Sequence, residues 1–267
     1  MSDPLAQLLE QRFGQPFPAA DLLPKEQAAA LAALAGQSSL RHFSTRPVPD
    51  DLLKLLCACA LSAPSKSDLQ LRDIVVIRDP ARKAALVELV PTAAWMAEAP
   101  VILIFCGNAG RLESLMRREA QPFPNNHADL LVNAVADAAI SLSWMQAAAN
   151  LAGLGGCAIS GLRDWAGEVA ELMGLGPLTL PFAGFALGWP EGERPITPRL
   201  PLSQTFHQDR LAAADDACVI AEYDAYRKTA GVGSWSGKRA RQYSAPLRPD
   251  FGAFLRGQGF RLDKDPT

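Results

Sequence analysis

The sequence predicts an α/β fold of the α+β kind: a mixed central sheet flanked by helices, with helical extensions at both ends. Two observations carry this prediction. The run Val101–Cys106 is apolar throughout and of strand length, as expected for a strand covered on both faces. The stretch Ala128–Leu151 is alanine-rich and apolar nearly all round, which is typical of a buried helix.

The first third of the chain reads as helices followed by a strand. Pro24 starts a helix that Gly36 ends, and we expect Asp50 to cap the next helix, which stops before Pro64. One apolar face of that helix comprises Leu52, Leu53, Leu56, Cys59 and Ala60. A short strand is expected at residues 74–77.

After the long helix, the glycines at 153–156 end it and a strand through Ala158 and Ile159 follows. A helix is expected from about residue 164 to 173, and the last core strand at 182–190. We therefore divide the chain into a helical N-terminal extension, a core and a C-terminal extension with a basic loop, at residues 1–36, 37–207 and 208–267.

Composition indicates a soluble enzyme of ordinary charge. The 267 residues suffice for one large domain, and the formal charge of −2 provides no overall attraction to nucleic acid or membrane. The five cysteines form no CxxC pair, which favours reduced thiols in a cytoplasmic protein. Met1-Ser2-Asp3 lacks a basic region and an apolar core, so we expect no signal peptide.

Three distant segments carry groups suited to an anion. Ser39-Leu40-Arg41, Pro64-Ser65-Lys66-Ser67 and Thr197-Pro198-Arg199 combine serine hydroxyls with cations. Arginine suits a phosphate because its planar fork makes two charge-assisted hydrogen bonds. An isolated arginine is more often a surface residue, but the joint occurrence of these segments favours a phosphate site.

These motifs, in this order and spacing, resemble the FMN-dependent nitroreductase family, closest to its NADPH-preferring oxygen-insensitive nitroreductase and flavin reductase branch. The resemblance runs from about Ser38 to His207 and more weakly to the C-terminus. It implies a nitroreductase-like fold and an FMN site, with Arg41 and Arg199 at the phosphate. The cofactor-binding residues it implies are Ser38, Ser39, Arg41, Ser65, Lys66, Ser67, Ala158, Ile159, Ser160, Gly161, Thr197 and Arg199.

The resemblance also implies how the flavin ring is held. The Ser65–Ser67 turn would lie along the ring, where Ser65 and Ser67 offer hydroxyls. Lys66 either stabilises negative charge on the reduced ring or is a solvated loop lysine. The backbone of residues 158–161 would pass close to the flavin, with Gly161 permitting the approach.

Several positions depart from the family pattern. The branch usually has His-Arg-Ser where this chain has Gln37-Ser38-Ser39, and Lys-Pro-Arg where it has Thr197-Pro198-Arg199. A usual glutamine is replaced by Ala93. We call the phosphate-binding site formed by these segments the cradle. Up to two cations and a histidine of the expected cradle are thus absent, which is consistent with weaker FMN binding or with a changed cofactor pose.

The segment Tyr226–Arg248 holds six cations and no acidic residue. The related branch places an arginine-containing loop here to bind the 2′-phosphate of NADPH, and Arg227 is the nearest match. Arg248 resembles the arginine of the family's tail that approaches the substrate face of the flavin. A solvated basic loop is the alternative, and nucleic-acid binding is disfavoured because few aromatic side chains accompany the charges.

Other chemistries find little support. Gly153-Leu154-Gly155-Gly156 follows a helix instead of opening one after a strand, so it is no dinucleotide fingerprint. His127 and His207 lack metal-ligand spacing, and no G-x-S-x-G motif occurs, so we expect neither a metal nor serine-hydrolase chemistry.

We therefore expect a homodimeric flavoenzyme. NADPH, or NADH, would reduce FMN, and small oxidants such as nitroaromatics, quinones or free flavins would reoxidise it in alternation, without a catalytic residue from the protein. Neither nucleic acid nor membrane is expected as a partner. The alternative is a non-catalytic flavin- or nucleotide-binding protein of the same fold.

Overall fold

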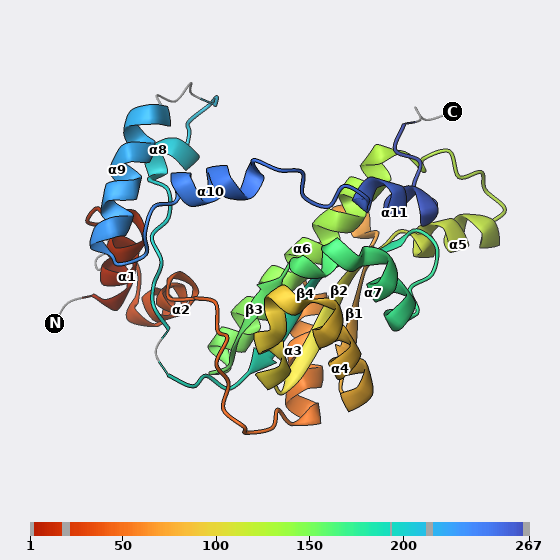
Figure 1. Cartoon of the computed structure of the whole chain (residues 1–267), viewed down its shortest axis with the longest axis horizontal. Coiled ribbons are helices and arrows are strands. Elements are labelled where there is room, and N and C mark those ends of the chain that lie inside the picture. The colour runs from red at the N-terminus through yellow and green to blue at the C-terminus, as the bar shows by residue number, and fades with distance from the viewer. Residues whose placement is uncertain (1–2, 18–21, 193, 212–215, 264–267) are drawn as a thin grey trace. The chain divides into compact units, whose positions relative to one another are not determined.

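The computed structural model describes residues 3–17, 22–192, 194–211 and 216–263 (Figure 1). The chain divides into two compact units: unit 1 comprises residues 1–38 and 193–247, and unit 2 comprises residues 39–192 and 248–267. Within the extensions expected at 1–36 and 208–267, residues 1–2, 18–21, 212–215 and 264–267 lie outside the described part.

Unit 2 is built on a four-stranded sheet in the order β1-β2-β4-β3. Its strands are β1 (Arg72–Ile77), β2 (Val101–Asn108), β3 (Gly155–Ile159) and β4 (Thr179–Gly188). All three pairings are antiparallel, so the mixed sheet expected from the sequence is wrong in strand direction. An apolar run shows that a strand is covered on both faces, but it carries no information about the direction of its neighbours.

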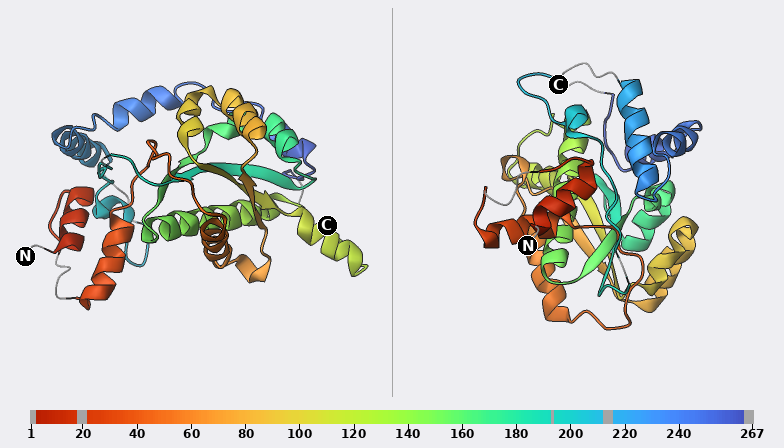
Figure 2. Two further views of the ribbon diagram at one scale, coloured as in Figure 1. Left: turned by 90° about the horizontal axis from the view of Figure 1, so that it is seen from below. Right: turned by 90° about the vertical axis from the view of Figure 1, so that its left-hand side faces the viewer.

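Helices cover both faces of this sheet, as the sequence predicts (Figure 2). On one face, Ile102, Ile104 and Cys106 of β2 pack with α4 (Pro80–Leu89), η2 (Pro91–Glu98) and α7 (Ala166–Met173). On the other face, the alternate β2 residues pack with α3 (Asp50–Leu61) and α6 (Ala128–Leu151). The period-2 alternation of a strand thus joins two separate hydrophobic clusters.

Helix α6 has the predicted bounds but is buried on one side only. Its other side leaves four large apolar side chains exposed, with exposed fractions of 60% for Val132, 36% for Ile140, 45% for Trp144 and 61% for Leu151. Among the described helices, α6 alone is long and apolar enough to cross a membrane by length and composition. Its buried side packs on the sheet, which accounts for much of that apolar composition.

Helix α3 differs from the expectation at its start and on its apolar face. Pro49, not Asp50, precedes the first helical residue, and the Asp50 carboxylate instead pairs with Arg78 at 2.6 Å. In the first turn, that carboxylate still complements the helix dipole. Cys59 is exposed, and the buried face consists of Leu53, Leu56 and Ala60.

The glycine run after α6 serves the chain reversal and strand packing. Gly153 has φ 77° and ends the helix. A Cβ at Gly156 would lie 2.2 Å from the Ala186 carbonyl oxygen and 2.4 Å from the Phe185 ring, so only glycine fits there. The helix expected at 164–173 forms as η3 (Gly161–Trp165) followed by α7. Helices α5 (Gly110–Arg118) and α11 (Phe251–Gly257) complete unit 2.

Unit 1 is helical. It contains α1 (Pro4–Phe13), α2 (Lys25–Ala35), α8 (Leu202–Thr205), α9 (Asp216–Thr229) and α10 (Ser236–Tyr243). Helix α2 ends at Gly36, as predicted. The Tyr226 hydroxyl on α9 lies 3.1 Å and 2.9 Å from the carbonyl oxygens of Glu10 and Gln11, which joins the N-terminal helix to the C-terminal segment.

Candidate functional site

The Ser39–Arg41 segment runs beside the sheet in unit 2. The Leu40 amide donates to the Gly156 carbonyl at 3.0 Å, and the Leu40 side chain is buried in the core. Its neighbours Ser39 and Arg41 are exposed. The Arg41 guanidinium lies 5.6 Å from the centroid of the Trp95 ring, and no described carboxylate forms an ion pair with it. The positive charge of Arg41 is therefore not neutralised by a described carboxylate, and it is available to an anionic ligand.

The turn at residues 64–70 has an unusual backbone. Ser67, Asp68 and Gln70 all have left-handed conformations, with φ of 51°, 56° and 52°. Ser65 Oγ donates to Asp137 Oδ2 at 2.7 Å and accepts from the Gln70 amide at 2.7 Å. The single proton of the Ser65 hydroxyl is therefore engaged within the protein, and Ser65 has only a lone pair left for a ligand. Lys66 and Ser67 are exposed.

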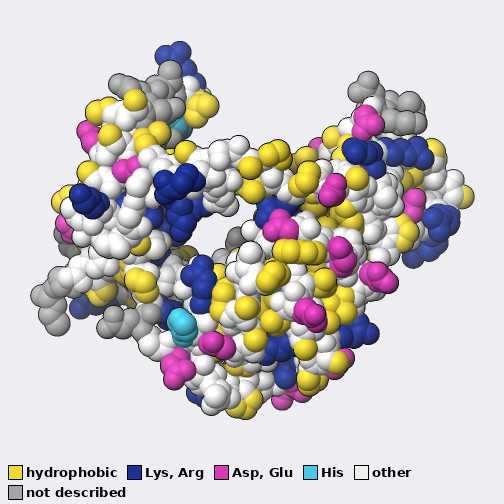
Figure 3. All heavy atoms as spheres, in the orientation of Figure 1, with side chains coloured by type: hydrophobic (Ala, Val, Ile, Leu, Met, Phe, Trp, Pro, Cys, Tyr) yellow, Lys and Arg dark blue, Asp and Glu magenta, His cyan; other side chains and the backbone are white. Residues whose placement is uncertain are grey.

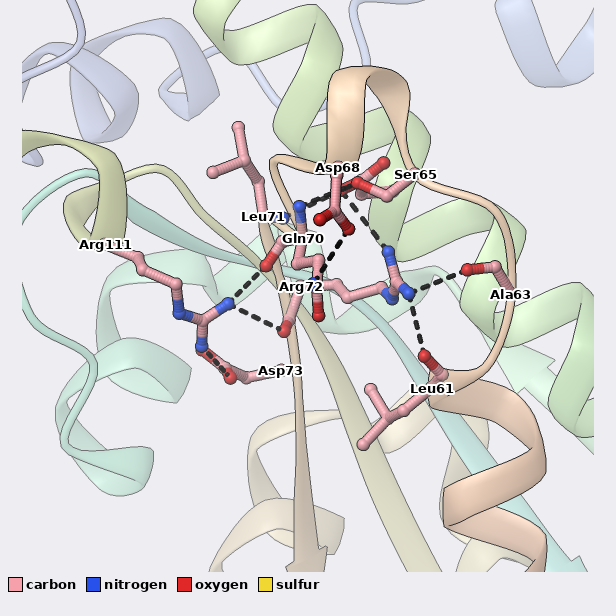
Figure 4. Close-up of polar contacts among 10 residues, drawn as sticks. Leu61, Ala63, Ser65, Asp68, Gln70, Leu71, Arg72, Asp73 and Arg111 are labelled. Atoms are coloured by element: carbon pink, nitrogen blue, oxygen red, sulfur yellow. Dashed lines mark hydrogen bonds and ion pairs between the residues drawn. The ribbon is translucent and has the colours of Figure 1, made fainter. Parts of the chain in front are cut away.

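A buried ion pair anchors this turn, and sequence reasoning missed it; Figure 4 labels its arginine, Arg72, beside Leu61 and Ala63. Arg72 at the start of β1 lies 3.5 Å from Asp137 of α6, and their side chains are 5% and 2% exposed. Arg72 Nη2 also donates to the carbonyls of Leu61 and Ala63, at 2.8 Å each. The available signal was a carboxylate in the middle of an otherwise apolar helix, because such a charge needs a buried partner.

The end of β3 brings two predicted site residues together. Ala158 and Ser160 are exposed and Ile159 is buried. Arg248 Nη2 donates to the Ser160 carbonyl at 3.2 Å, and Arg248 Nε pairs with Asp164 at 2.8 Å. A Cβ at Gly161 would meet its nearest neighbours at 3.4 Å, which is ordinary contact. The protein packing around Gly161 thus does not itself require glycine.

Unit 1 places Ser38, Thr197 and Arg199 around a buried arginine that the sequence analysis did not select. Arg12 of α1 is 5% exposed. Its Nε donates to the Ala35 carbonyl at 3.0 Å, its Nη1 donates to the Thr197 carbonyl at 2.8 Å, and its Nη2 donates to the Gln37 carbonyl. The Arg199 amide in turn donates to the Arg12 carbonyl at 2.6 Å.

This cluster is electropositive. Burial lowers the pKa of the Arg12 guanidinium, and the nearby Arg199 cation lowers it further. Arg199 is exposed, and its Nη1 donates to Thr197 Oγ1 at 2.8 Å. Ser38 Oγ is buried without a hydrogen-bond partner in the described part of the chain. A buried hydroxyl donor without an acceptor, one residue after the Gln37 carbonyl that Arg12 binds, is suited to an anion.

Arg199 and Arg227 line the same cleft of unit 1. The cleft has a volume of about 480 Å³ and is lined by Phe13, Pro198, Arg199, Leu200, Leu202, Thr205, Tyr223, Arg227 and Trp235. Arg227 Nε donates to the Gly233 carbonyl at 2.9 Å, and its Nη2 donates to the Val232 carbonyl at 3.3 Å. Two of its five N–H groups are therefore engaged by its own loop, a third donates to the Tyr223 hydroxyl at 3.3 Å, and the other two remain available.

Asp224 organises the start of the basic helix α10. Its carboxylate accepts from the Trp235 amide at 2.5 Å, from the Ser236 amide at 3.2 Å and from the Ser234 hydroxyl at 2.9 Å. The hydrogen bond from the Ser236 hydroxyl, together with these contacts, holds the pKa of Asp224 at about 2. Figure 3 shows Lys and Arg side chains gathered over α10 on this face of unit 1. The loop between α9 and α10 is thus held in place by Arg227 and Asp224.

His127 takes a structural position as the residue before α6, where its Nδ1 accepts from the Asp129 amide at 3.4 Å. Within the described ranges, no group of three or more His, Cys, Asp or Glu side chains is arranged to hold a metal.

Comparison with known proteins decides the family. The model described as "Nitroreductase family" matches residues 34–91 and 89–189, and that described as "Nitroreductase family, C-terminal domain" matches residues 197–263. The chain belongs to the nitroreductase family. The family resemblance drawn from the motifs and the nitroreductase-like fold are thereby confirmed, and the relatives named below confirm the branch.

Individual members of the nitroreductase family match most of the chain. The oxygen-insensitive NADPH nitroreductase of Salmonella typhimurium is 32% identical over 238 residues, covering 85% of this chain and 96% of that protein. The FMN reductase [NAD(P)H] of Bacillus subtilis is 30% identical, covering 88% and 98%. The crystal structure of nitroreductase A from Vibrio parahaemolyticus superposes with a TM-score of 0.81 at 27% identity, covering 89% and 99%.

The nitroreductase family models begin at residue 34, so α1 with Arg12 lies outside both matched ranges. Each unit by itself offers donors of the kind that FMN requires. Arg41 and Arg199 carry no described ion pair, and the buried Ser38 hydroxyl has no described partner. Cations and hydroxyls of this kind suit a phosphate and a polyhydroxyl chain.

Proposed function

We propose that the chain is an FMN-dependent oxidoreductase that takes reducing equivalents from NAD(P)H and passes them to small oxidants: nitroaromatics, quinones or flavins. The family membership, together with relatives named as an NADPH nitroreductase and an FMN reductase over nearly their whole length, carries this proposal. Both relatives are enzymes by name, which favours an enzyme over a non-catalytic flavin-binding protein.

When bound, FMN supplies the hydride chemistry. The protein's contribution is to hold the cofactor and its surroundings. From the motif resemblance, we assign Ser38, Ser39, Arg41, the Ser65–Ser67 turn, Thr197 and Arg199 to cofactor binding. Lys66 is exposed on a turn that Asp137 holds through Ser65, so its cation is available to stabilise negative charge on the reduced ring.

The end of β3 is assigned to the flavin through its backbone. Arg248 donates to the Ser160 carbonyl and pairs with Asp164, which holds residues 160–164 in place. This supports a role of Arg248 beside the flavin-binding segment, in which the guanidinium both orders the backbone and offers its remaining N–H groups to a substrate.

For the nicotinamide, NADPH is favoured over NADH. Arg227 lines the unit 1 cleft and retains free N–H groups, and the neighbouring α10 contributes Lys238, Arg239 and Arg241. A 2′-phosphate adds charge that these cations can bind. Because Asp224 and Arg227 already order the loop, less ordering entropy opposes binding than for a free loop.

We also propose that the protein is a cytoplasmic homodimer. The exposed apolar side of α6, with Val132, Ile140, Trp144 and Leu151, supports self-association, because monomers rarely leave such a row uncovered. In the described part of the chain the five cysteines form no disulfide, as suits a reducing compartment.

The test is spectroscopic. Purified protein should be yellow with an FMN spectrum, and anaerobic addition of NADPH should bleach it. Steady-state assays across quinones, nitroaromatics and FMN, with NADPH and with NADH, should give parallel double-reciprocal lines because the two substrates react in alternation. Protein that binds FMN but is not reduced by either nicotinamide would refute the proposed activity and favour the non-catalytic alternative.

A further inference from the structure

The cradle of this chain lacks cations at two places where the family pattern has them, namely Gln37-Ser38 and Thr197. These two segments are the ones that Arg12 contacts. Its guanidinium donates to the Gln37 carbonyl through Nη2 and to the Thr197 carbonyl through Nη1, at 2.8 Å for the latter. Because Arg12 belongs to α1, which lies outside the matched family ranges, the cation reaches the cradle from an extension.

The charge of Arg12 is not neutralised by the protein around it. In the described part of the chain, its hydrogen-bond partners are backbone carbonyls and Thr197 Oγ1, and no carboxylate forms an ion pair with it. A buried cation without a counter-ion is costly, and a second cation, Arg199, lies close enough to lower the pKa of Arg12. A bound dianion would relieve both effects.

A third observation points to the same ligand chemistry. Ser38 Oγ is buried and lacks a hydrogen-bond partner in the described residues, and it directly follows the Gln37 carbonyl that Arg12 holds. A buried hydroxyl without a partner is rare in proteins. An anion with several acceptor oxygens could accept a hydrogen bond from this hydroxyl.

We propose that Arg12 compensates for the cations missing at these two places. It holds Gln37–Ser38 and Thr197–Arg199 in position, and it adds a fixed positive charge for the phosphate of FMN. Arg12 is buried, so it acts as a positioning residue behind Arg199, which is exposed. The inference rests on the proposed FMN site, but its anion chemistry can be tested separately.

The experiment compares FMN with riboflavin, which lacks the phosphate. In Arg12→Met, we expect the dissociation constant for FMN to rise on the order of tenfold or more, while that for riboflavin changes little, because only the phosphate loses a charge interaction. Adding Thr197→Lys to Arg12→Met should restore much of the preference for FMN.

Tyr226→Phe is the matched control, because it loosens the hold on the same helix α1 without changing charge. It should lower the melting temperature and leave the FMN-to-riboflavin ratio unchanged. Equal losses of FMN and riboflavin binding in Arg12→Met, or the same fall of the ratio in Tyr226→Phe, would show a purely structural role and overturn the inference.

A second readout does not require flavin. Inorganic phosphate should raise the melting temperature of the apoprotein, and this rise should disappear in Arg12→Met but persist in Tyr226→Phe. If wild-type protein bound neither flavin, the proposed function would fail, whereas the phosphate response would still decide whether Arg12 supports an anion site. A phosphate response that is the same in wild type and Arg12→Met would refute the role of Arg12.

Discussion

The pair of Arg72 and Asp137 shows how a single buried charge can determine the shape of a functional turn. Asp137 accepts from Ser65 Oγ and from the Leu71 amide at 2.7 Å each, while Arg72 holds the end of α3 through the carbonyls of Leu61 and Ala63. Both ends of the turn that carries Lys66 are thus held by one ion pair, and this segment is positioned from the core.

Replacing one partner of this pair should be more damaging than replacing both. Asp137→Asn leaves Arg72 as an uncompensated buried cation, so we expect a loss of about 3–5 kcal/mol in the free energy of unfolding. The double variant Arg72→Met/Asp137→Leu should recover part of it, because it leaves no buried charge, although the Leu71 amide and the Leu61 and Ala63 carbonyls still lose their partners. Urea unfolding of the apoproteins measures both, and equal losses in the single and double variants would contradict this account.

The two phosphate arginines can be tested one at a time. Arg41→Ala and Arg199→Ala should each weaken FMN binding by about 1.5–3 kcal/mol, because each removes a charge-assisted contact. Equilibrium dialysis against FMN measures the loss, with Arg118→Ala on the exposed end of α5 as the control. FMN affinity like that of wild type in both variants would refute the assignment.

The test of Arg227 must separate ligand binding from loop structure, because Arg227 also donates to the carbonyls of Gly233 and Val232 in its own loop. In Arg227→Ala, we expect kcat/KM for NADPH to fall relative to that for NADH, and the difference to shrink with salt because the contact is ionic. Lys228→Ala controls for the general loss of a cation. If the wild type preferred NADH, or if Arg227→Ala did not change the ratio of kcat/KM for NADPH to that for NADH, the proposed binding of NADPH by this loop would be refuted.

At the level of elements, the start of α10 depends on one carboxylate. Hydrogen bonds from Ser236, Trp235 and Ser234 lower the pKa of Asp224 from 3.8 to about 2. Because the folded-state pKa is depressed, Asp224 stabilises the loop above the unfolded value near pH 4, and this contribution is lost as the pH falls toward 2.

We therefore expect amide exchange at residues 231–237 to increase selectively between about pH 4 and pH 2, after correction for intrinsic rates. Asp224→Asn should show faster exchange at every pH and lose the pH dependence, since it cannot ionise. Asp250→Asn, at the start of α11, is the matched control and should leave this segment unchanged. A wild-type loop whose protection is independent of pH in this range would rule out the proposed role of Asp224.

For the whole molecule, the exposed side of α6 predicts the oligomeric state. Val132→Asp/Trp144→Asp places two charges in the exposed apolar row and should convert the proposed dimer to a monomer, because an unpaired charge is costly to bury in an interface. Sedimentation velocity at micromolar concentration measures the change. Leu115→Asp on α5, also an exposed leucine, should have no effect. A wild-type protein that is monomeric with FMN bound would contradict the prediction.

Much of the fold follows from local patterns. The bounds of α6, the end of α2 at Gly36 and the apolar strand β2 could all be predicted, because each depends on periodicity and on nearby glycine or proline. The order and spacing of the serine and arginine motifs were sufficient to indicate the nitroreductase family. These features depend on residues that are close in the sequence, so they can be predicted without knowing how the rest of the chain folds.

Strand direction, the buried pair of Arg72 and Asp137, and the contacts of Arg12 were decided only by the tertiary structure. Arg12 lies 185 residues from Thr197 in the chain, and Arg72 lies 65 residues from Asp137. Whether a charged side chain is solvated or buried against a distant partner depends on which segments pack together, since burial and counter-charges determine its energy. The sequence by itself determined which residue types were available for an anion site, and the packing decided which of them became its support.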